Sequence, residues 1–97
     1  MRYTYIPKNV CARKIEFDIN NNIITNVSFA GGCDGNLKAI SKLVEGMNAE
    51  DIISKLSGNT CGFKNTSCAD QLANAIKEAM QKIKNWEISL TLLKLAK

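Results

Sequence analysis

The sequence contains no histidine among its 97 residues, and this absence excludes two kinds of site. Nucleophilic catalysis by a Ser-His or Cys-His pair requires an imidazole base, which the chain cannot supply. Metal sites built on imidazole are excluded as well, so cysteine is the only soft ligand left. Four cysteines are present, and they are the first candidates for chemistry.

Long hydrophobic runs are also lacking. No stretch approaches the roughly 20 apolar residues that a bilayer-spanning helix needs. The first residues, Met1 to Tyr5, do not resemble the apolar core of a signal peptide. We therefore expect a cytoplasmic protein without a membrane partner, in a compartment that keeps thiols reduced. The length predicts one domain with a single core.

Basic charge is present but not concentrated. Thirteen lysines and arginines stand against nine acidic residues, which gives a formal net charge of +4. Only Arg13 and Lys14 are adjacent, and aromatic residues make up 6% of the chain. Nucleic-acid-binding proteins cluster their basic residues on one face or in one arm. The pattern therefore predicts no direct binding to nucleic acid.

The first third of the chain has the period of β-strands. Residues 13–19 are predicted to form a half-buried strand, because Ile15, Phe17 and Ile19 alternate with polar residues and fall on one face. Residues 20–22 are three asparagines and suit a hairpin turn, and residues 23–30 predict a second strand. Residues 3–6 are a candidate third strand that ends at Pro7, a residue best tolerated at a sheet edge.

After residue 36 the apolar period becomes helical. A helix is predicted to end at Gly46, a second to begin at the N-cap Asn48 and end at Gly58, and a third to begin near Ala69. The apolar face of the first helix is predicted to contain Leu37, Ile40, Leu43 and Val44. The stripe of the third helix comprises Leu72, Ile76, Ala79, Met80 and Ile83. Strands followed by helices indicate an α+β fold: an antiparallel sheet of two to three N-terminal strands with three helices packed on one face.

The chain is predicted to divide into a four-cysteine domain, residues 1–85, and an apolar tail, residues 86–97. The tail alternates like a strand, but Trp86, Leu90 and Leu93 also continue the stripe of the third helix. We favour a continued helix. An exposed leucine-rich end of this kind would support homo-oligomers through residues 86–97.

Two cysteines stand where helices are predicted to begin. Cys33 lies in the glycine-rich residues 31–35, and Cys68 precedes the third helix; the unpaired N–H groups at a helix start favour a thiolate. Glycine also follows Cys61, and glycine lets the backbone approach a ligand closely. Because the ends of a hairpin are adjacent, Cys11 before the first strand is expected near Cys33 after the second. The predicted metal ligands are Cys11, Cys33, Cys61 and Cys68.

Four thiolates without histidine suit tetrahedral zinc or an iron–sulfur cluster, and composition does not choose between them. Three ligating cysteines with one spectator fit nearly as well. No Cys-x-x-Cys pair is present, so burial of single cysteines in the core is an alternative, and a disulfide framework is a less favoured one. Asp34 and Asp70 stand beside candidate ligands, where acidic residues usually serve the helix dipole. The sequence contains no self-contained catalytic constellation.

The segment Thr66-Ser67-Cys68-Ala69-Asp70 resembles the Thr-Ser-Cys-Pro-Asp signature of the TSCPD domain family, with alanine in place of proline. The small four-cysteine branch of that family is similar at four further motifs: Val10-Cys11, Gly31 to Asn36, Leu43 to Met47, and Cys61-Gly62. TSCPD domains occur at the C-terminus of cobalamin-dependent (class II) ribonucleotide reductases. The resemblance therefore implies an accessory role in ribonucleotide reduction and deoxynucleotide synthesis, with a reductase as the partner.

A more distant similarity of architecture links the chain to the U-type iron–sulfur cluster scaffold proteins. Cys11, Cys33 and Cys68 match the scaffold's three cysteines in order and context, and Cys61 would replace its missing ligand. Four protein thiolates imply a retained metal or cluster, with a cluster-assembly protein as a second candidate partner. Two alternative functions are a nucleotide-binding protein of the ribonucleoside-diphosphate reductase type and a metal-free interaction module.

Overall fold

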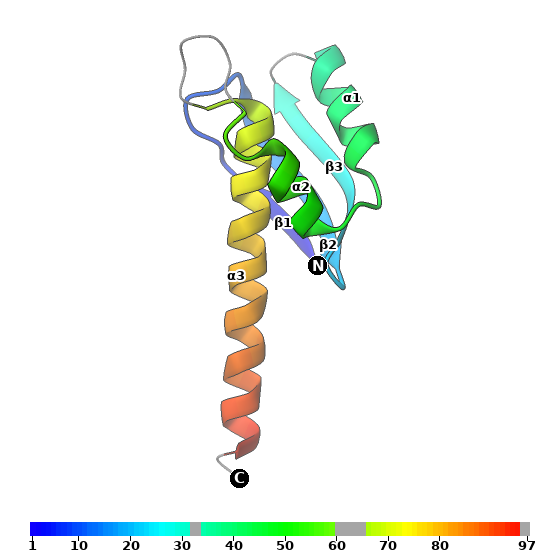
Figure 1. Cartoon of the computed structure of the whole chain (residues 1–97). Coiled ribbons are helices and arrows are strands. Elements are labelled where there is room, and N and C mark those ends of the chain that lie inside the picture. Colours follow the sequence, from blue (N-terminus) through cyan, green and yellow to red (C-terminus); the bar gives the residue numbers. More distant parts are fainter. Residues whose placement is uncertain (32–33, 60–65, 96–97) are drawn as a thin grey trace.

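The computed structural model describes residues 1–31, 34–59 and 66–95, and for residue 34 and residues 85–95 it describes the backbone alone. The strands are β1 (Arg2–Tyr5), β2 (Ala12–Asn20) and β3 (Ile23–Gly31), followed by the helices α1 (Asp34–Val44), α2 (Ala49–Leu56) and α3 (Cys68–Leu95). The strands form one antiparallel sheet in the order β1-β2-β3 (Figure 1). The predicted α+β fold is confirmed. Within the described part of the chain, no helix has the length and hydropathy that crossing a membrane requires.

The turn between β2 and β3 lies where the three asparagines predict it. Asn21 and Asn22 have φ angles of +51° and +66°, and asparagine tolerates this left-handed region better than most residues. Two consecutive left-handed residues match the twist of the flanking strands, as in a type I′ hairpin. The turn therefore sets the pairing of Asn20 with Ile23 that begins the β2–β3 ladder.

One helix-covered face of the sheet supplies most of the core. Phe17 and Ile15 of β2 are fully buried, as are Ile52 of α2 and Ile76 of α3. All three helices contribute to the same buried cluster as the sheet, so they pack on one face, as expected. The stripe of α3 is confirmed: Leu72, Ile76 and Ala79 are fully buried, and Met80 and Ile83 pack against them.

The prediction for Leu43 is wrong. Leu43 is 75% exposed, whereas Leu37 and Val44 of the same helix are buried. Residues seven apart return to nearly the same face of a helix, while Leu43 is turned about 100° from Val44. The core-facing stripe of α1 is thus narrower than its apolar composition suggests.

Simple alternation along β3 is interrupted at Asn26. The register shifts between Glu16 and Asp18 of β2, and Asn26, in the opposing part of β3, has a φ of +54°. An extra residue in one strand is a β-bulge, and it lets Ile24 and Val27, three apart, both turn into the core. The sequence pattern predicts the strand but not this bulge.

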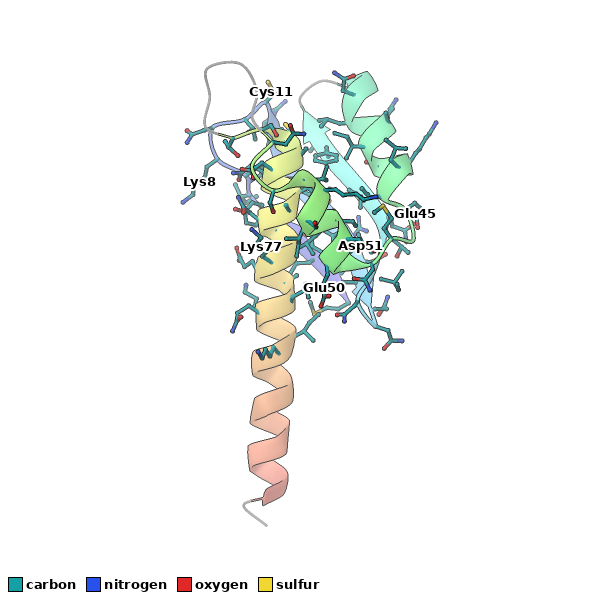
Figure 2. All side chains as sticks on the ribbon, in the orientation of Figure 1. Lys8, Cys11, Glu45, Glu50, Asp51 and Lys77 are labelled. Atoms are coloured by element: carbon teal, nitrogen blue, oxygen red, sulfur yellow. The ribbon has the colours of Figure 1, made fainter. Side chains whose placement is uncertain are left out.

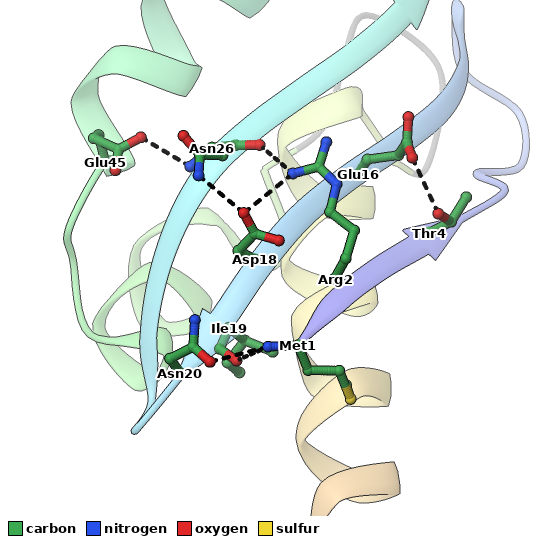
Figure 3. Close-up of polar contacts among 9 residues, drawn as sticks. All are labelled: Met1, Arg2, Thr4, Glu16, Asp18, Ile19, Asn20, Asn26 and Glu45. Carbon is green, nitrogen blue, oxygen red and sulfur yellow. Dashed lines mark hydrogen bonds and ion pairs between the residues drawn. The ribbon is translucent and has the colours of Figure 1, made fainter.

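Polar contacts on the open face of the sheet hold the bulge in place (Figure 3). The Nδ2 atom of Asn26 donates to Asp18 at 2.9 Å, and its backbone N–H donates to Glu45 at 2.9 Å. Arg2 donates to the carbonyl oxygen of Asn26 at 3.0 Å and forms an ion pair with Asp18 at 3.5 Å. Side chains from all three strands therefore join across this face.

Both predicted features at the ends of α2 are confirmed. The side chain of Asn48 accepts the N–H of Glu50 at 2.9 Å, which caps the N-terminus. Gly58 follows the helix with a φ of +78°, a conformation that side chains rarely adopt.

The third helix continues without a break from Cys68 to Leu95, so it crosses the predicted boundary at residue 85. The preference for helix over strand in the tail is confirmed for residues 86–95. Among the described side chains, core contacts along α3 reach Ile83. Figure 1 shows that the second half of α3 projects past the sheet and past α2.

Tyr3 fastens the edge strand β1 to α3. Its hydroxyl donates to Glu78 Oε1 at 2.5 Å, its ring lies 5.7 Å from the ring of Phe17, and the ammonium of Lys82 lies 5.2 Å from its centroid. Burial raises the pKa of Tyr3 well above its usual value, and the hydrogen bond to the Glu78 carboxylate raises it further. The folded protein therefore keeps the Tyr3 proton at a pH where the unfolded chain loses it.

This difference predicts a loss of stability in alkali. Below about pH 10 the Tyr3 contribution is complete, and it declines as the pH rises further because only the unfolded state ionises. We expect Tyr3→Phe to flatten the decline by up to about 1.4 kcal/mol per pH unit. Urea unfolding of both proteins between about pH 8 and pH 11 measures the difference. Parallel curves for the two proteins would contradict the assignment.

Candidate metal site

The structure places two of the four predicted ligands. Cys68 is the first residue of α3 and is partly exposed, and Cys11 is exposed in the loop before β2. Neither forms a disulfide. Figure 2 shows Cys11 at the end of the molecule where α3 begins. Cys33 and Cys61 lie outside the described residues.

Within residues 1–31, 34–59 and 66–95, no three cysteine, aspartate or glutamate side chains gather closely enough to hold a metal. The assignment of all four cysteines as metal ligands therefore stays a prediction. The structural information on it comes from the hydrogen bonds and the packing near Cys11 and Cys68.

The start of α3 is built by the residues on either side of Cys68. Ser67 is the cap: its Oγ accepts the N–H of Asp70 at 3.1 Å, and its carbonyl oxygen accepts the N–H of Gln71 at 2.8 Å. The Ser67 hydroxyl also donates to the carbonyl oxygen of Asn59. The segment that follows α2 is therefore fastened to the residue before Cys68.

Asp70 strengthens the same connection. Its carboxylate accepts the Thr66 hydroxyl at 2.6 Å and the backbone N–H of Gly58 at 2.7 Å. The hydrogen bond from Thr66 lowers the pKa of Asp70, and the N–H of Gly58 lowers it further. Asp70 thus joins the end of α2 to the first turn of α3, which is a structural role rather than that of a general base.

Gln71 connects a third segment to this helix start. Its Nε2 atom donates to Thr66 Oγ1 at 3.0 Å, while its Oε1 atom accepts the backbone N–H of Lys8 at 3.2 Å and the hydroxyl of Tyr5 at 3.4 Å. The residue is 7% exposed. A buried amide with three partners holds the loop that contains Cys11 against α3. Sequence reasoning missed Gln71, whose only local signal is its place in the first turn.

The end of β3 lies against the backbone of Cys11. A Cβ atom on Gly31 would lie 3.5 Å from the Cys11 carbonyl oxygen and 3.3 Å from Nε of Arg13, and Gly31 has a φ of +81°. Close packing and a left-handed backbone together favour glycine here. Gly31 is two residues before Cys33 in the sequence.

The described neighbours of all four cysteines therefore meet at one end of the domain. Gly31 lies against the backbone of Cys11, the carbonyl oxygen of Asn59 accepts a hydrogen bond from Ser67, and Gln71 accepts one from Lys8. The hydrogen bonds among Thr66, Ser67, Asp70, Gln71 and their partners are called the helix-start network below. What this network can do chemically is hold backbone segments that carry thiols in fixed relative positions.

These features define a small α+β domain whose last helix opens with a Thr-Ser-Cys-x-Asp motif that fastens the neighbouring loops. The chain belongs to the TSCPD domain family, whose model matches residues 1–80. The matched region ends inside α3, so the last 15 residues of this helix lie outside the match. Comparisons with curated proteins and with solved structures gave no match.

Proposed function

We propose that this TSCPD domain binds one metal centre, zinc or an iron–sulfur cluster, through Cys11, Cys33, Cys61 and Cys68. Its biological role would be accessory to ribonucleotide reduction. The helix-start network is the observation that supports the metal site, because it joins three segments of the chain near the two described cysteines.

The network matters because metal binding by distant residues is opposed by chain entropy. Ordering a residue costs about 1–2 kcal/mol of backbone entropy, so a ligand on a loose loop binds weakly. Here Lys8, three residues before Cys11, is hydrogen-bonded to α3, and Gly58, three residues before Cys61, is hydrogen-bonded there too. Part of the backbone entropy of these loops is thus already lost when the protein folds, so metal binding has less ordering to oppose it.

The chemistry of the described cysteines fits a thiolate centre. Cys68 stands at the start of a 28-residue helix and is partly exposed. Cys11 is exposed, so a metal ion can reach it from solvent. Zinc would supply a cross-link between the loops, whereas an iron–sulfur cluster would also supply one-electron transfer.

The link to ribonucleotide reduction rests on the family. The resemblance to TSCPD domains at the C-terminus of cobalamin-dependent ribonucleotide reductases suggests that this domain acts together with such an enzyme, or with a cluster-assembly protein. The reduction itself is not proposed for this chain, because the sequence offers no self-contained catalytic constellation.

Elemental analysis of anaerobically purified protein tests the proposal. We expect about one equivalent of zinc per chain in a colourless sample, or iron with a visible absorption band in a coloured one. Less than about 0.2 equivalents of any metal would contradict the proposal.

A second candidate function is self-association through residues 86–97. The projection of α3 beyond the sheet favours it (Figure 1), since an unaccompanied helical half offers a surface to a second copy. We expect the full chain to sediment as a dimer or larger species and a chain ended at Asn85 to sediment as a monomer. Sedimentation velocity over a range of concentrations measures both, and a monomeric full chain would remove this candidate.

A further inference from the structure

A groove runs between the edge strand β3 and the helix α1, with a volume of about 550 Å³. Its apolar side chains are Val27, Phe29 and Leu37. The other residues that line it are Ser28 and Gly31 from the strand and Lys38, Ser41 and Lys42 from the helix.

The groove follows the backbone edge of β3 rather than one of its faces. Successive side chains of a strand point to opposite faces, yet the consecutive residues 27, 28 and 29 all line the groove. Val27 is buried on the core face, whereas Ser28 is exposed. Because the groove is lined both by a residue of the core face and by a residue of the open face, it must also run along the backbone edge that lies between the two faces.

Only the first part of this edge is covered by the chain itself. Ile24 exchanges backbone hydrogen bonds with Met47 at 2.9 Å and Gly46 at 2.8 Å, and the N–H of Asn26 is bound by Glu45. Among the described residues, no backbone–backbone hydrogen bond from outside the sheet reaches residues 27–31. An edge strand with open backbone groups is a template for pairing with another strand.

The basic residues that line the groove favour an acidic partner. Two of its lining residues are the lysines Lys38 and Lys42, one helical turn apart on α1, and none of the described lining residues is acidic. At the end of β3, the guanidinium of Arg13 lies against Gly31. A chain that enters this groove would therefore meet positive charge from Lys42 and, at the end of β3, from Arg13.

We propose that residues 27–31 of β3 accept an extended, acidic segment of a partner protein, which adds a fourth strand between β3 and α1. Strand addition supplies main-chain hydrogen bonds, and alternate side chains supply specificity. Apolar side chains of the segment would contact Phe29 and Leu37, and its carboxylates would face Lys42. The inference concerns a surface separate from the cysteines and does not require a bound metal.

A fluorescent peptide of about seven residues that alternates glutamate and valine is the probe, since this length spans the open edge. We expect saturable binding to the full-length reduced protein by fluorescence anisotropy. A peptide that alternates lysine and valine should bind at least about tenfold more weakly. Amide chemical shifts of the labelled protein should change mainly in residues 27–31 and in α1.

Lys42→Glu and Lys55→Glu form a matched pair, because each lysine is exposed in the last turn of its helix and only Lys42 lines the groove. We expect Lys42→Glu to weaken binding about three- to tenfold and Lys55→Glu to weaken it less than about twofold. The inference is overturned by the absence of saturable binding at about 1 mM peptide, by equal losses in the two variants, or by shift changes centred elsewhere. Occupation of the groove by a second copy of the chain, seen as concentration-dependent shifts of residues 27–31 without peptide, would overturn it as well.

Discussion

Cys68→Ser is expected to lower the bound metal from about one equivalent per chain to less than about 0.2 and to weaken metal affinity at least about 100-fold. Cys68 is the first residue of α3, and the serine hydroxyl that replaces its thiol binds zinc or iron poorly because a hydroxyl is a weaker ligand for these metals than a thiolate. Because serine has nearly the shape of cysteine, the fold should persist. Competition with a chromophoric chelator measures the affinity, and elemental analysis measures the content.

The control for this variant is the metal-free wild-type protein. After chelation the two proteins should unfold at the same temperature, since the difference between them is then one sulfur atom. Cys11→Ser, Cys33→Ser and Cys61→Ser extend the series: a variant that keeps full metal content identifies its cysteine as the spectator of a three-ligand site. Full metal retention by Cys68→Ser would contradict the proposed ligand set.

Gln71→Leu is expected to lower the free energy of unfolding of the metal-free protein by about 1–3 kcal/mol. The substitution leaves the part-buried N–H of Lys8 and the hydroxyl of Tyr5 without their acceptor, and it removes the donor to Thr66, whose hydroxyl still donates to Asp70. Metal affinity should fall about 10- to 100-fold, because residues that orient ligands typically matter to this extent. Urea unfolding and chelator competition measure the two effects separately.

Lys84→Leu is the control, since Lys84 is an exposed residue of the same helix and lies outside the helix-start network. We expect it to change stability by less than about 0.5 kcal/mol and to leave metal affinity within about twofold. A loss of stability in Gln71→Leu without any loss of affinity would mean that the network supports the fold alone. The main support for the metal site would then be removed.

Much of the fold follows from local patterns. The alternation of residues 15–19, the asparagines before β3 and the cap at Asn48 each act over a few residues, and each is where the sequence predicts it. The bulge at Asn26 depends instead on partners in β1, in β2 and after α1, which no local window contains. Leu43 shows a related limit, because helical period alone does not tell how wide the covered face will be.

The candidate site divides in the same way. That Cys68 opens a helix and that Asp70 lies in its first turn could be predicted, because helix starts have a local signature. The role of Gln71 could not, since its partners Lys8 and Tyr5 are more than 60 residues away in sequence. The groove along β3 also escaped prediction: it requires knowing that the strand is at an edge and that α1 lies beside it.

The uninterrupted course of α3 has a mechanical consequence. At 1.5 Å per residue, its 28 residues make a lever roughly 42 Å long that begins at a proposed ligand. A tilt of about 10° at Cys68 would sweep the far end through roughly 7 Å. A small change in the direction of α3 at the helix-start network would therefore move its C-terminal end by several ångströms.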